Sequence, residues 1–478
     1  MAHTTCIRNA AWIIAWDVAA GEQVYLRDAD LAFAGNTILH VGKSFPGSAD
    51  TVIDGREMML IPGLVDIHSH PSTEPFFRGI REEHGVPAMF MSGLYERSLA
   101  FRSDAEGRRA GKTVAYCEML RTGITSVADL SGADPWWIDL AAQSGLRVFL
   151  APGFASARWH LENEWQLRYA WDEPAGHRGL QQALALIAEA VRHPCGRLSG
   201  VVFPAQIDTC TEALLRESWA AAEAQDLPFT THCAQSVNEF NEMLGRHGRT
   251  PIRWARDIGI LGPRSVLGHA IFTDEHSWTR WHTKDDVRTL AETGASVAHC
   301  PSPFARYGQT LEDFGRYRRA GINMGLGTDV SPHNLIEEMR LAAILARVAA
   351  QDIDATSTAV LFHAATVGGA TALGRADLGR LAPGARADLV LIDLTNPFML
   401  PARDPLRSLV YTAADRAVHS VFVDGEKVVD AGRVLTLDHA EALAQLGEAQ
   451  ARMEADVPRH DWAHRRADQI APLSLPVR

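Results

Sequence analysis

The chain has 478 residues, of which 46% are hydrophobic, and a formal net charge of −12. Its length allows a large buried core, whereas its acidic balance argues against a nucleic-acid-binding surface, which needs a basic footprint. No apolar stretch approaches the roughly 20 residues of a membrane span, and the N-terminus lacks the pattern of a secretory signal. The six cysteines form no CxxC pair, which fits reduced thiols. We therefore expect a cytoplasmic globular protein.

The two ends of the chain share one pattern. Residues 1–58 alternate apolar and polar side chains as antiparallel strands do, and residues 381–436 repeat this alternation. The second stretch contains "VFVDGEKVV", whose Asp-Gly pair is typical of a tight hairpin turn. We predict one small β domain contributed by both ends, followed by a C-terminal helix and tail over residues 437–478.

Between residues 59 and 380, short apolar runs alternate with segments of helical length. This alternation is typical of a parallel (β/α)8 barrel, with a doubly wound open sheet as the alternative. We favour the barrel because the polar residues that end several runs would converge on one point in a closed sheet. The predicted strands cover residues 60–68, 124–130, 147–154, 198–206, 228–234, 265–272, 295–301 and 322–330.

The first of these strands ends in "DIHSHP", which places His68 and His70 two residues apart. Side chains at this spacing point to the same side of a strand, and barrel active sites lie at the carboxyl ends of strands. Two imidazoles held in this way form half of a typical zinc site. An isolated pair would be better explained as hydrogen-bonded core histidines or loop residues.

Three further polar residues end other predicted strands. His232 ends the fifth strand, His269 the sixth and Asp329 the eighth. Burying such groups without partners costs roughly several kcal/mol each. Imidazoles and a carboxylate together suit a borderline divalent cation such as zinc or ferrous iron, so we predict a metal site at these strand ends.

The motifs "PGLVDIHSHP", "THCA", "GHAIF", "VAHCPS", "GLGTDVSPHN" and "GRLAPGARADLVLIDL" follow one another in an order that resembles the amidohydrolase superfamily. Within it they are similar to the branch of triazine hydrolases, cytosine and guanine deaminases and adenosylhomocysteine deaminases. The resemblance implies that His68, His70, His232 and Asp329 bind a divalent metal ion, zinc with iron as the alternative. It also implies that His269 orients or deprotonates a water molecule and that Asp329 accepts a proton.

The implied reaction is hydrolysis. A bound metal lowers the pKa of water toward ~7, and the resulting nucleophile attacks an electron-poor sp² carbon to cleave a C–N bond of a small heterocycle. Many relatives hold a second metal with a carboxylated lysine on the fourth strand. The corresponding run here, "VVFPAQI", has neither Lys nor Glu, so we expect a single ion.

The pattern departs from that of the deaminases at two positions. Gln235 stands where they carry a glutamate that protonates the ring, and Ala205 stands where they often carry a histidine. An amide donates a hydrogen bond but cannot deliver a proton. We expect substrate contacts from Gln206, Gln235, His299 and Ser331. Replacement acids could come from Glu74, Glu82, Glu83, His84 or Glu239, although we expect each of them to lie on a solvated loop or helix face instead.

The first functional hypothesis is therefore a metal-dependent hydrolase of C–N bonds. The alternatives are displacement of a chloride or sulfur leaving group from a triazine-like ring, and a catalytically silent barrel protein. We expect a homodimer or a higher homo-oligomer. Residues 136–171 hold five of the twelve tryptophans, which fits either a substrate lid or a subunit contact.

Overall fold

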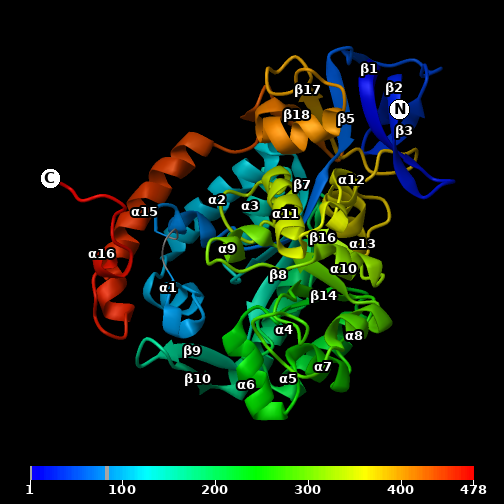
Figure 1. Cartoon of the computed structure of the whole chain (residues 1–478). Helices are drawn as coiled ribbons and strands as arrows, with labels where there is room; N and C mark the ends of the chain where they lie inside the picture. The colour runs from blue at the N-terminus through cyan, green and yellow to red at the C-terminus, as the bar shows by residue number, and fades with distance from the viewer. Residues whose placement is uncertain (1–2, 81–84) are drawn as a thin grey trace.

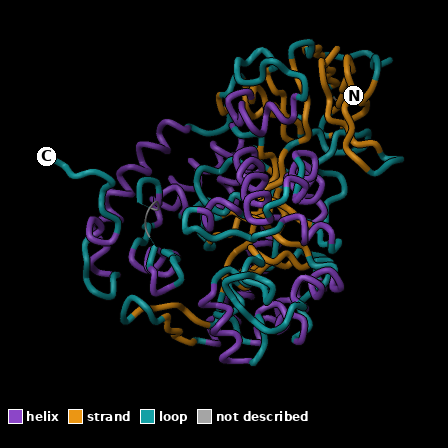
Figure 2. The backbone as a smooth tube through the Cα atoms, viewed as in Figure 1, coloured by secondary structure: helices purple, strands orange, loops and turns teal. Residues whose placement is uncertain are grey.

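The computed structural model describes residues 3–80 and 85–478 (Figures 1 and 2). Eight parallel strands form its centre, and the fourth of them is divided into two short pieces. In chain order they are β6 (Leu64–Ser69), β7 (Ile124–Ser131), β8 (Arg147–Phe154), β11 (Leu198–Gly200) with β12 (Phe203–Pro204), β13 (Phe229–Cys233), β14 (Ser265–His269), β15 (Ser296–His299) and β16 (Met324–Leu326).

Two seams close these strands into a barrel. One parallel sheet runs from β6 to β11 and the other from β13 to β16. Parallel bridges join Val202 to Phe229 and Gln206 to His232 at one seam, and Ser69 to Asp329 at the other. The strands follow one another around the barrel in chain order. The predicted (β/α)8 fold is therefore confirmed, and the alternative of a doubly wound open sheet is wrong.

Helices surround the barrel (Figure 1), and many begin at a residue whose side chain accepts a hydrogen bond from the first turn. Asp104, Asp172 and Thr211 cap α2, α4 and α5 in this way. The helices from α1 to α13 are α1 (Leu94–Ala100), α2 (Ala105–Arg121), α3 (Trp137–Ser144), α4 (Glu173–Val191), α5 (Glu212–Ala224), α6 (Val237–His247), α7 (Pro251–Asp257), α8 (Asp286–Thr293), α9 (Pro301–Ala305), α10 (Phe314–Arg319), α11 (Leu335–Ala350), α12 (Thr358–His363) and α13 (Gly369–Ala372).

The two chain ends build one nine-stranded sheet, as expected (blue and orange in Figure 1). The N-terminal and C-terminal parts meet where β5 pairs with β1 on one side and β17 on the other. Its members are β1 (Thr4–Asp17), β2 (Glu22–Ala34), β3 (Thr37–Gly42), β4 (Thr51–Asp54), β5 (Met58–Pro62), β17 (Leu389–Asp393), β18 (Val418–Val423), β19 (Glu426–Asp430) and β20 (Arg433–Val434). The short α14 (Pro405–Ser408) follows β17.

The strand expected over residues 60–68 is in fact two strands. β5 belongs to the composite sheet and β6 to the barrel, with Gly63 between them. A side chain at Gly63 would collide with Thr125 of β7, so the crossing from one sheet to the other requires glycine. The division cannot be recognised in the sequence, because both strands are buried and their apolar residues form one continuous run.

The C-terminal segment lies against the barrel rather than against the composite sheet. The long helix α15 (His439–His460) packs along α2 and reaches α1, and α16 (Ala467–Ile470) follows it (red in Figure 1). Met453 of α15 contributes to the lining of the large cavity described below. The last part of the chain therefore contributes to the surroundings of the site.

A buried ion pair joins the barrel to the composite sheet. The Arg147 guanidinium, at the start of β8, donates to both carboxylate oxygens of Asp388 at 3.0 and 3.1 Å and to Asp424 at 2.9 Å. The side chain of Arg147 is 2% exposed and that of Asp388 3%. Removing one partner of such a pair lowers the stability of the fold strongly, because the other charge then stays buried without a counter-charge.

Replacing Arg147 with Met should therefore destabilise the protein by about 3–5 kcal/mol, since Asp388 would remain buried and unpaired. Chemical denaturation, followed by tryptophan fluorescence, measures the change. The matched control is Arg56→Met, which breaks an Arg–Asp pair whose side chains are 74% and 57% exposed and should leave the midpoint unchanged. Equal midpoints for the two variants would contradict this role of Arg147.

Candidate active site

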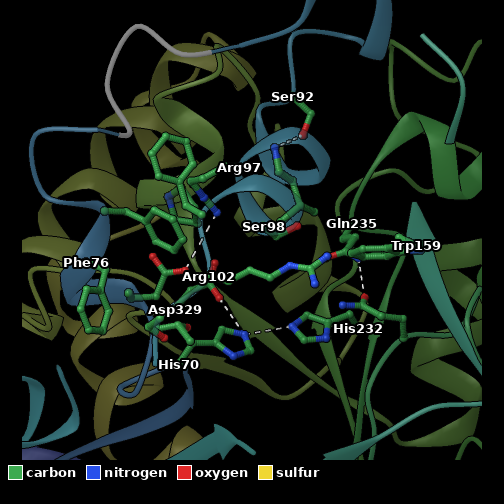
Figure 3. A pocket seen from close by; sticks show the side chains of 18 of the residues that line it. His70, Phe76, Ser92, Arg97, Ser98, Arg102, Trp159, His232, Gln235 and Asp329 are labelled. Carbon is green, nitrogen blue, oxygen red and sulfur yellow. Dashed lines mark hydrogen bonds and ion pairs between the residues drawn. The ribbon is translucent and has the colours of Figure 1, made fainter. Parts of the chain in front are cut away.

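Polar side chains from three strand ends meet at one end of the barrel (Figure 3). The ligand atoms of His68, His70, His232 and Asp329 all lie within 4.8 Å of one another. His70 Nε2 lies 3.3 Å from Asp329 Oδ1 and 3.2 Å from His232 Nε2, and His68 Nε2 lies 3.4 Å from the same carboxylate oxygen. The structure thus brings together the four residues that the sequence proposes as ligands.

Backbone carbonyls orient two of these imidazoles. His70 Nδ1 lies 3.0 Å from the Leu130 carbonyl oxygen, and His232 Nδ1 lies 2.6 Å from that of Ala205. A carbonyl oxygen can only accept, so each Nδ1 carries the proton and donates. Both Nε2 lone pairs therefore face the cluster, which is the arrangement found when the second nitrogen of a histidine binds a metal.

The cluster lacks donors to balance its acceptors. The ring nitrogens of His68 are buried and make no hydrogen bond with the described residues. Burial lowers the pKa of His68 and, more strongly, that of His232, so both are neutral near pH 7. Burial alone would raise the pKa of Asp329, but the imidazoles of His68 and His70, 3.4 and 3.3 Å from its Oδ1, hold it well below its usual value. Lone pairs and a carboxylate that face one another fit a cation.

His269 stands beside this group at the end of β14. Its ring centroid is 4.7 Å from that of His68 and 4.7 Å from that of Phe304. Burial lowers its pKa to about 3, which leaves a neutral imidazole at neutral pH. Its φ of 79° and that of 56° at Asp329 are unusual for residues other than glycine and cluster at this one site.

A second polar layer, not anticipated from the sequence, lies behind the cluster. Asp66, two residues before His68, accepts from the Thr328 hydroxyl at 2.6 Å and from the backbone N–H groups of His68 and Thr328. These bonds hold the first and last strands together next to His68 and Asp329. The signal was present, since Asp66 is a charged residue within an otherwise apolar run.

Above the cluster is a cavity of about 390 Å³ (Figure 3). His70, His232, His269 and Asp329 form its floor, and its walls include Phe76, Phe101, Trp159, Phe304 and Tyr307. Its size and its combination of aromatic walls with polar side chains are typical of small-molecule sites.

An amide pair occupies one wall of the cavity. The Gln235 Nε2 amide donates to Gln206 Oε1 at 2.5 Å, and both side chains line the cavity. Two other proposed contacts lie outside this lining. His299 faces the Phe314 ring at 5.5 Å, and Ser331 accepts from the Arg78 guanidinium at 2.9 Å. A direct substrate contact by His299 or Ser331 has no support from the cavity.

The candidate acids differ in their surroundings. Glu74 lines the cavity and lies 4.0 Å from the Arg97 guanidinium. Glu239 accepts from the backbone N–H groups of Ala234 and Gln235 at 2.5 and 3.2 Å. Both glutamates are buried, so the expectation of solvated faces was wrong for these two. Glu82, Glu83 and His84 lie outside the described residues.

The tryptophan-rich region contributes to the cavity through a hairpin of β9 (Ala157–Leu161) and β10 (Leu167–Trp171). The Trp159 indole N–H donates to Asp208 at 3.1 Å, and Tyr169 donates to the same carboxylate oxygen at 2.7 Å. Trp159 is thereby fixed as a wall of the cavity. Trp137, in contrast, is buried beneath the barrel surface, where it donates to Asp129.

Within the described part of the chain, no helix is both long and apolar enough to cross a membrane.

The curated relatives include a 5'-deoxyadenosine deaminase of Methanothermobacter thermautotrophicus, which is 30% identical over 90% of this chain and 93% of its own length.

Two solved structures share the fold. An adenosine deaminase from Xanthomonas campestris with bound zinc has a TM-score of 0.80, is 23% identical, and aligns over 94% of this chain and 98% of its own. A mutant of atrazine chlorohydrolase from Arthrobacter aurescens TC1, complexed with zinc and atraton, has a TM-score of 0.75, is 26% identical, and aligns over 93% of this chain and 100% of its own.

The model of the amidohydrolase family matches residues 59–428, which span the barrel and most of the second half of the composite sheet. This match confirms the resemblance seen in the motifs: the chain belongs to the amidohydrolase family.

Proposed function

We propose that this protein is a mononuclear metal-dependent aminohydrolase that cleaves a C–N bond at an electron-poor sp² carbon of a small nitrogen heterocycle. The observation that carries the proposal is the group of four ligand atoms within 4.8 Å of one another on the floor of an aromatic-walled cavity. The name of the curated relative, a 5'-deoxyadenosine deaminase, supports the same reaction class.

The residues that would hold the metal are His68, His70, His232 and Asp329. The inward-facing Nε2 lone pairs and the unpartnered ring nitrogens of His68 fit a divalent cation, and nitrogen with carboxylate oxygen suits zinc, with ferrous iron as the alternative. When bound there, such an ion supplies the Lewis acidity that makes water nucleophilic at neutral pH.

His269 and Asp329 would handle protons. His269 is a neutral imidazole on the cavity floor, so it can orient a water molecule and accept a proton from it. Asp329 is a carboxylate, so it can accept a proton from the water molecule and then pass this proton to the leaving group. Gln235 and Gln206 would bind a substrate carbonyl or ring nitrogen through hydrogen bonds without transferring a proton.

A second candidate reaction is displacement of chloride or a sulfur substituent from a triazine-like ring. The amide at Gln235 favours it, because such leaving groups depart without ring protonation. The likeness to atrazine chlorohydrolase supports this alternative. Assaying ammonia and chloride release from purines, pterins, triazines and chlorotriazines decides between the two reactions, and turnover of none of them would contradict both.

We also propose that the enzyme acts in the cytoplasm and self-associates. The six cysteines are unpaired, as expected of a reducing compartment. Ile344 and Val348 of α11 are 46% and 69% exposed, which fits a contact between subunits.

Metal content tests the ligand set. We expect one divalent ion per chain, and His68→Ala should reduce this well below one and abolish activity, because a ligand is lost. Elemental analysis of the purified protein measures it. The matched control is His282→Ala at an exposed histidine, which should keep the ion. Two tightly bound ions per chain would contradict the mononuclear site.

His269→Asn separates catalysis from metal binding. We expect the variant to keep most of its metal while its rate falls by roughly two to four orders of magnitude, the usual scale for a positioned acid–base group. Metal content and kcat are measured on the same preparation. A parallel loss of both would make His269 a ligand.

Gln235→Glu tests whether the substrate needs a proton from this position. If it does not, the variant should be slower, because a carboxylate close to a cation ionises and repels the lone pairs that the amide attracts. The measurement is kcat/KM on the best substrate of the panel, with Gln235→Ala as the control for lost packing. A faster Glu variant would show that the natural reaction does require ring protonation.

A further inference from the structure

One face of helix α1 and the turn after it lies over the cavity. The residues of this segment that line the cavity are Leu94, Arg97, Ser98, Phe101 and Arg102. Leu94, Arg97 and Ser98 lie three and four residues apart on one side of α1, and Phe101 and Arg102 follow directly after the helix ends. This face carries two guanidinium groups and no carboxylate.

The opposite face is held by the C-terminal segment. Glu96 pairs with Arg465, which also pairs with Asp461 at 2.7 Å. These contacts fix the rotation of α1, so that Arg97 faces the cavity. Arg102 also borders a small adjacent cavity. The two carboxylates that line this cavity, Glu96 and Asp461, both pair with Arg465.

Two of the three arginines that line the large cavity have partners. Arg97 donates to the Tyr307 hydroxyl at 2.9 Å and lies 4.0 Å from Glu74. Arg108 makes a forked pair with Asp134 at 3.0 and 2.7 Å. Their charges are therefore already compensated by the protein.

Arg102 differs from both. Its Nε donates to the Leu99 carbonyl oxygen at 2.9 Å, and none of the carboxylates in residues 3–80 and 85–478 pairs with it. Figure 3 shows its side chain crossing the cavity above His70 and His232, with the guanidinium directed toward Trp159 and Gln235. A cation that no described carboxylate pairs with favours an anion in the same space.

We infer that the substrate is a planar heterocycle that carries a carboxylate, and that Arg102 binds this group. The inference rests on the proposed function, which places the ring carbon that reacts over the cluster of His70, His232 and Asp329. The two free terminal nitrogens of Arg102 match a carboxylate in a forked pair. Trp159 offers a flat surface for the ring between these two ends.

This geometry assigns a specificity role to Arg102 rather than a structural one. The side chain is exposed at the cavity mouth, and within the described part of the chain its single hydrogen bond, made by Nε, leaves the two terminal nitrogens without a partner. Its replacement should therefore alter binding while leaving the fold and the metal content unchanged.

Matched pairs of probes test the inference on the zinc-loaded enzyme. Pterin with pterin-6-carboxylate, and uracil with orotate, differ by one carboxylate. Fluorescence for the pterins and calorimetry for the pyrimidines measure binding without requiring turnover. We expect the wild-type protein to prefer the charged member of a pair, and the preference to weaken as ionic strength rises.

Arg102→Gln should weaken binding of the carboxylate by about 10- to 100-fold and leave that of the neutral probe unchanged, the range for a hydrogen bond to a charged group. Arg102→Lys should fall between, because it keeps the charge but loses the fork. The matched control is Arg109→Gln, an exposed arginine of α2 outside the cavity lining, which should bind as the wild type does.

The result separates this inference from the proposed function. A protein that binds the carboxylates through Arg102 but releases neither ammonia nor chloride would sustain the inference and contradict the reaction. A wild type that shows no preference for the charged probe in either pair, or an Arg102→Gln variant that keeps the preference, would overturn the inference even if hydrolysis is found.

Discussion

Closure of the barrel between its first and last strands also assembles the polar cluster. The Asp329 N–H donates to the His68 carbonyl at 2.8 Å, and the His70 N–H donates to the Asp329 carbonyl at 3.3 Å. The backbone pairing that completes the fold therefore sets the distance between the carboxylate of Asp329 and the imidazoles of His68 and His70. Asp329 adopts a left-handed conformation at this junction, which aspartate tolerates better than most residues.

Burial then determines the charge state of the cluster. Burial favours the neutral forms of His68 and His232, and the carbonyls that accept from Nδ1 of His70 and His232 turn the Nε2 atoms of these two rings toward the cluster. Without a cation, the Nε2 atoms of His70 and His232, 3.2 Å apart, would face each other with like partial charge. Burying these polar groups costs free energy as long as the cluster holds no cation. A bound positive ion offsets this cost, so the same burial makes the cluster selective for a cation.

The barrel and its strand ends could be predicted because polar residues at the ends of several apolar runs are costly to bury unless they converge on a shared ligand. What decides the surroundings of the site comes from distant parts of the chain. The orientation of α1 depends on Arg465, 369 residues after its partner Glu96, and no local pattern reveals that pairing. Glu239 lies four residues after Gln235 and looks like an exposed helix position, yet its carboxylate is buried at the start of α6.

The position of Glu239 bears on the chemistry of the site. Both of its oxygens accept backbone N–H groups, from Ala234 and Gln235, so the carboxylate holds the loop after β13 rather than facing the cavity. Of the described residues that line the cavity, Glu74 and Asp329 alone carry carboxylates, and Glu74 lies beside Arg97. Under the proposed function, proton transfer would then fall to Asp329 and His269 on the floor, while the amides of Gln206 and Gln235 on the wall would only orient the ring. Protons would be exchanged only at the floor of such a site. It therefore favours substrates whose leaving group faces the floor and whose ring needs no proton on its opposite edge.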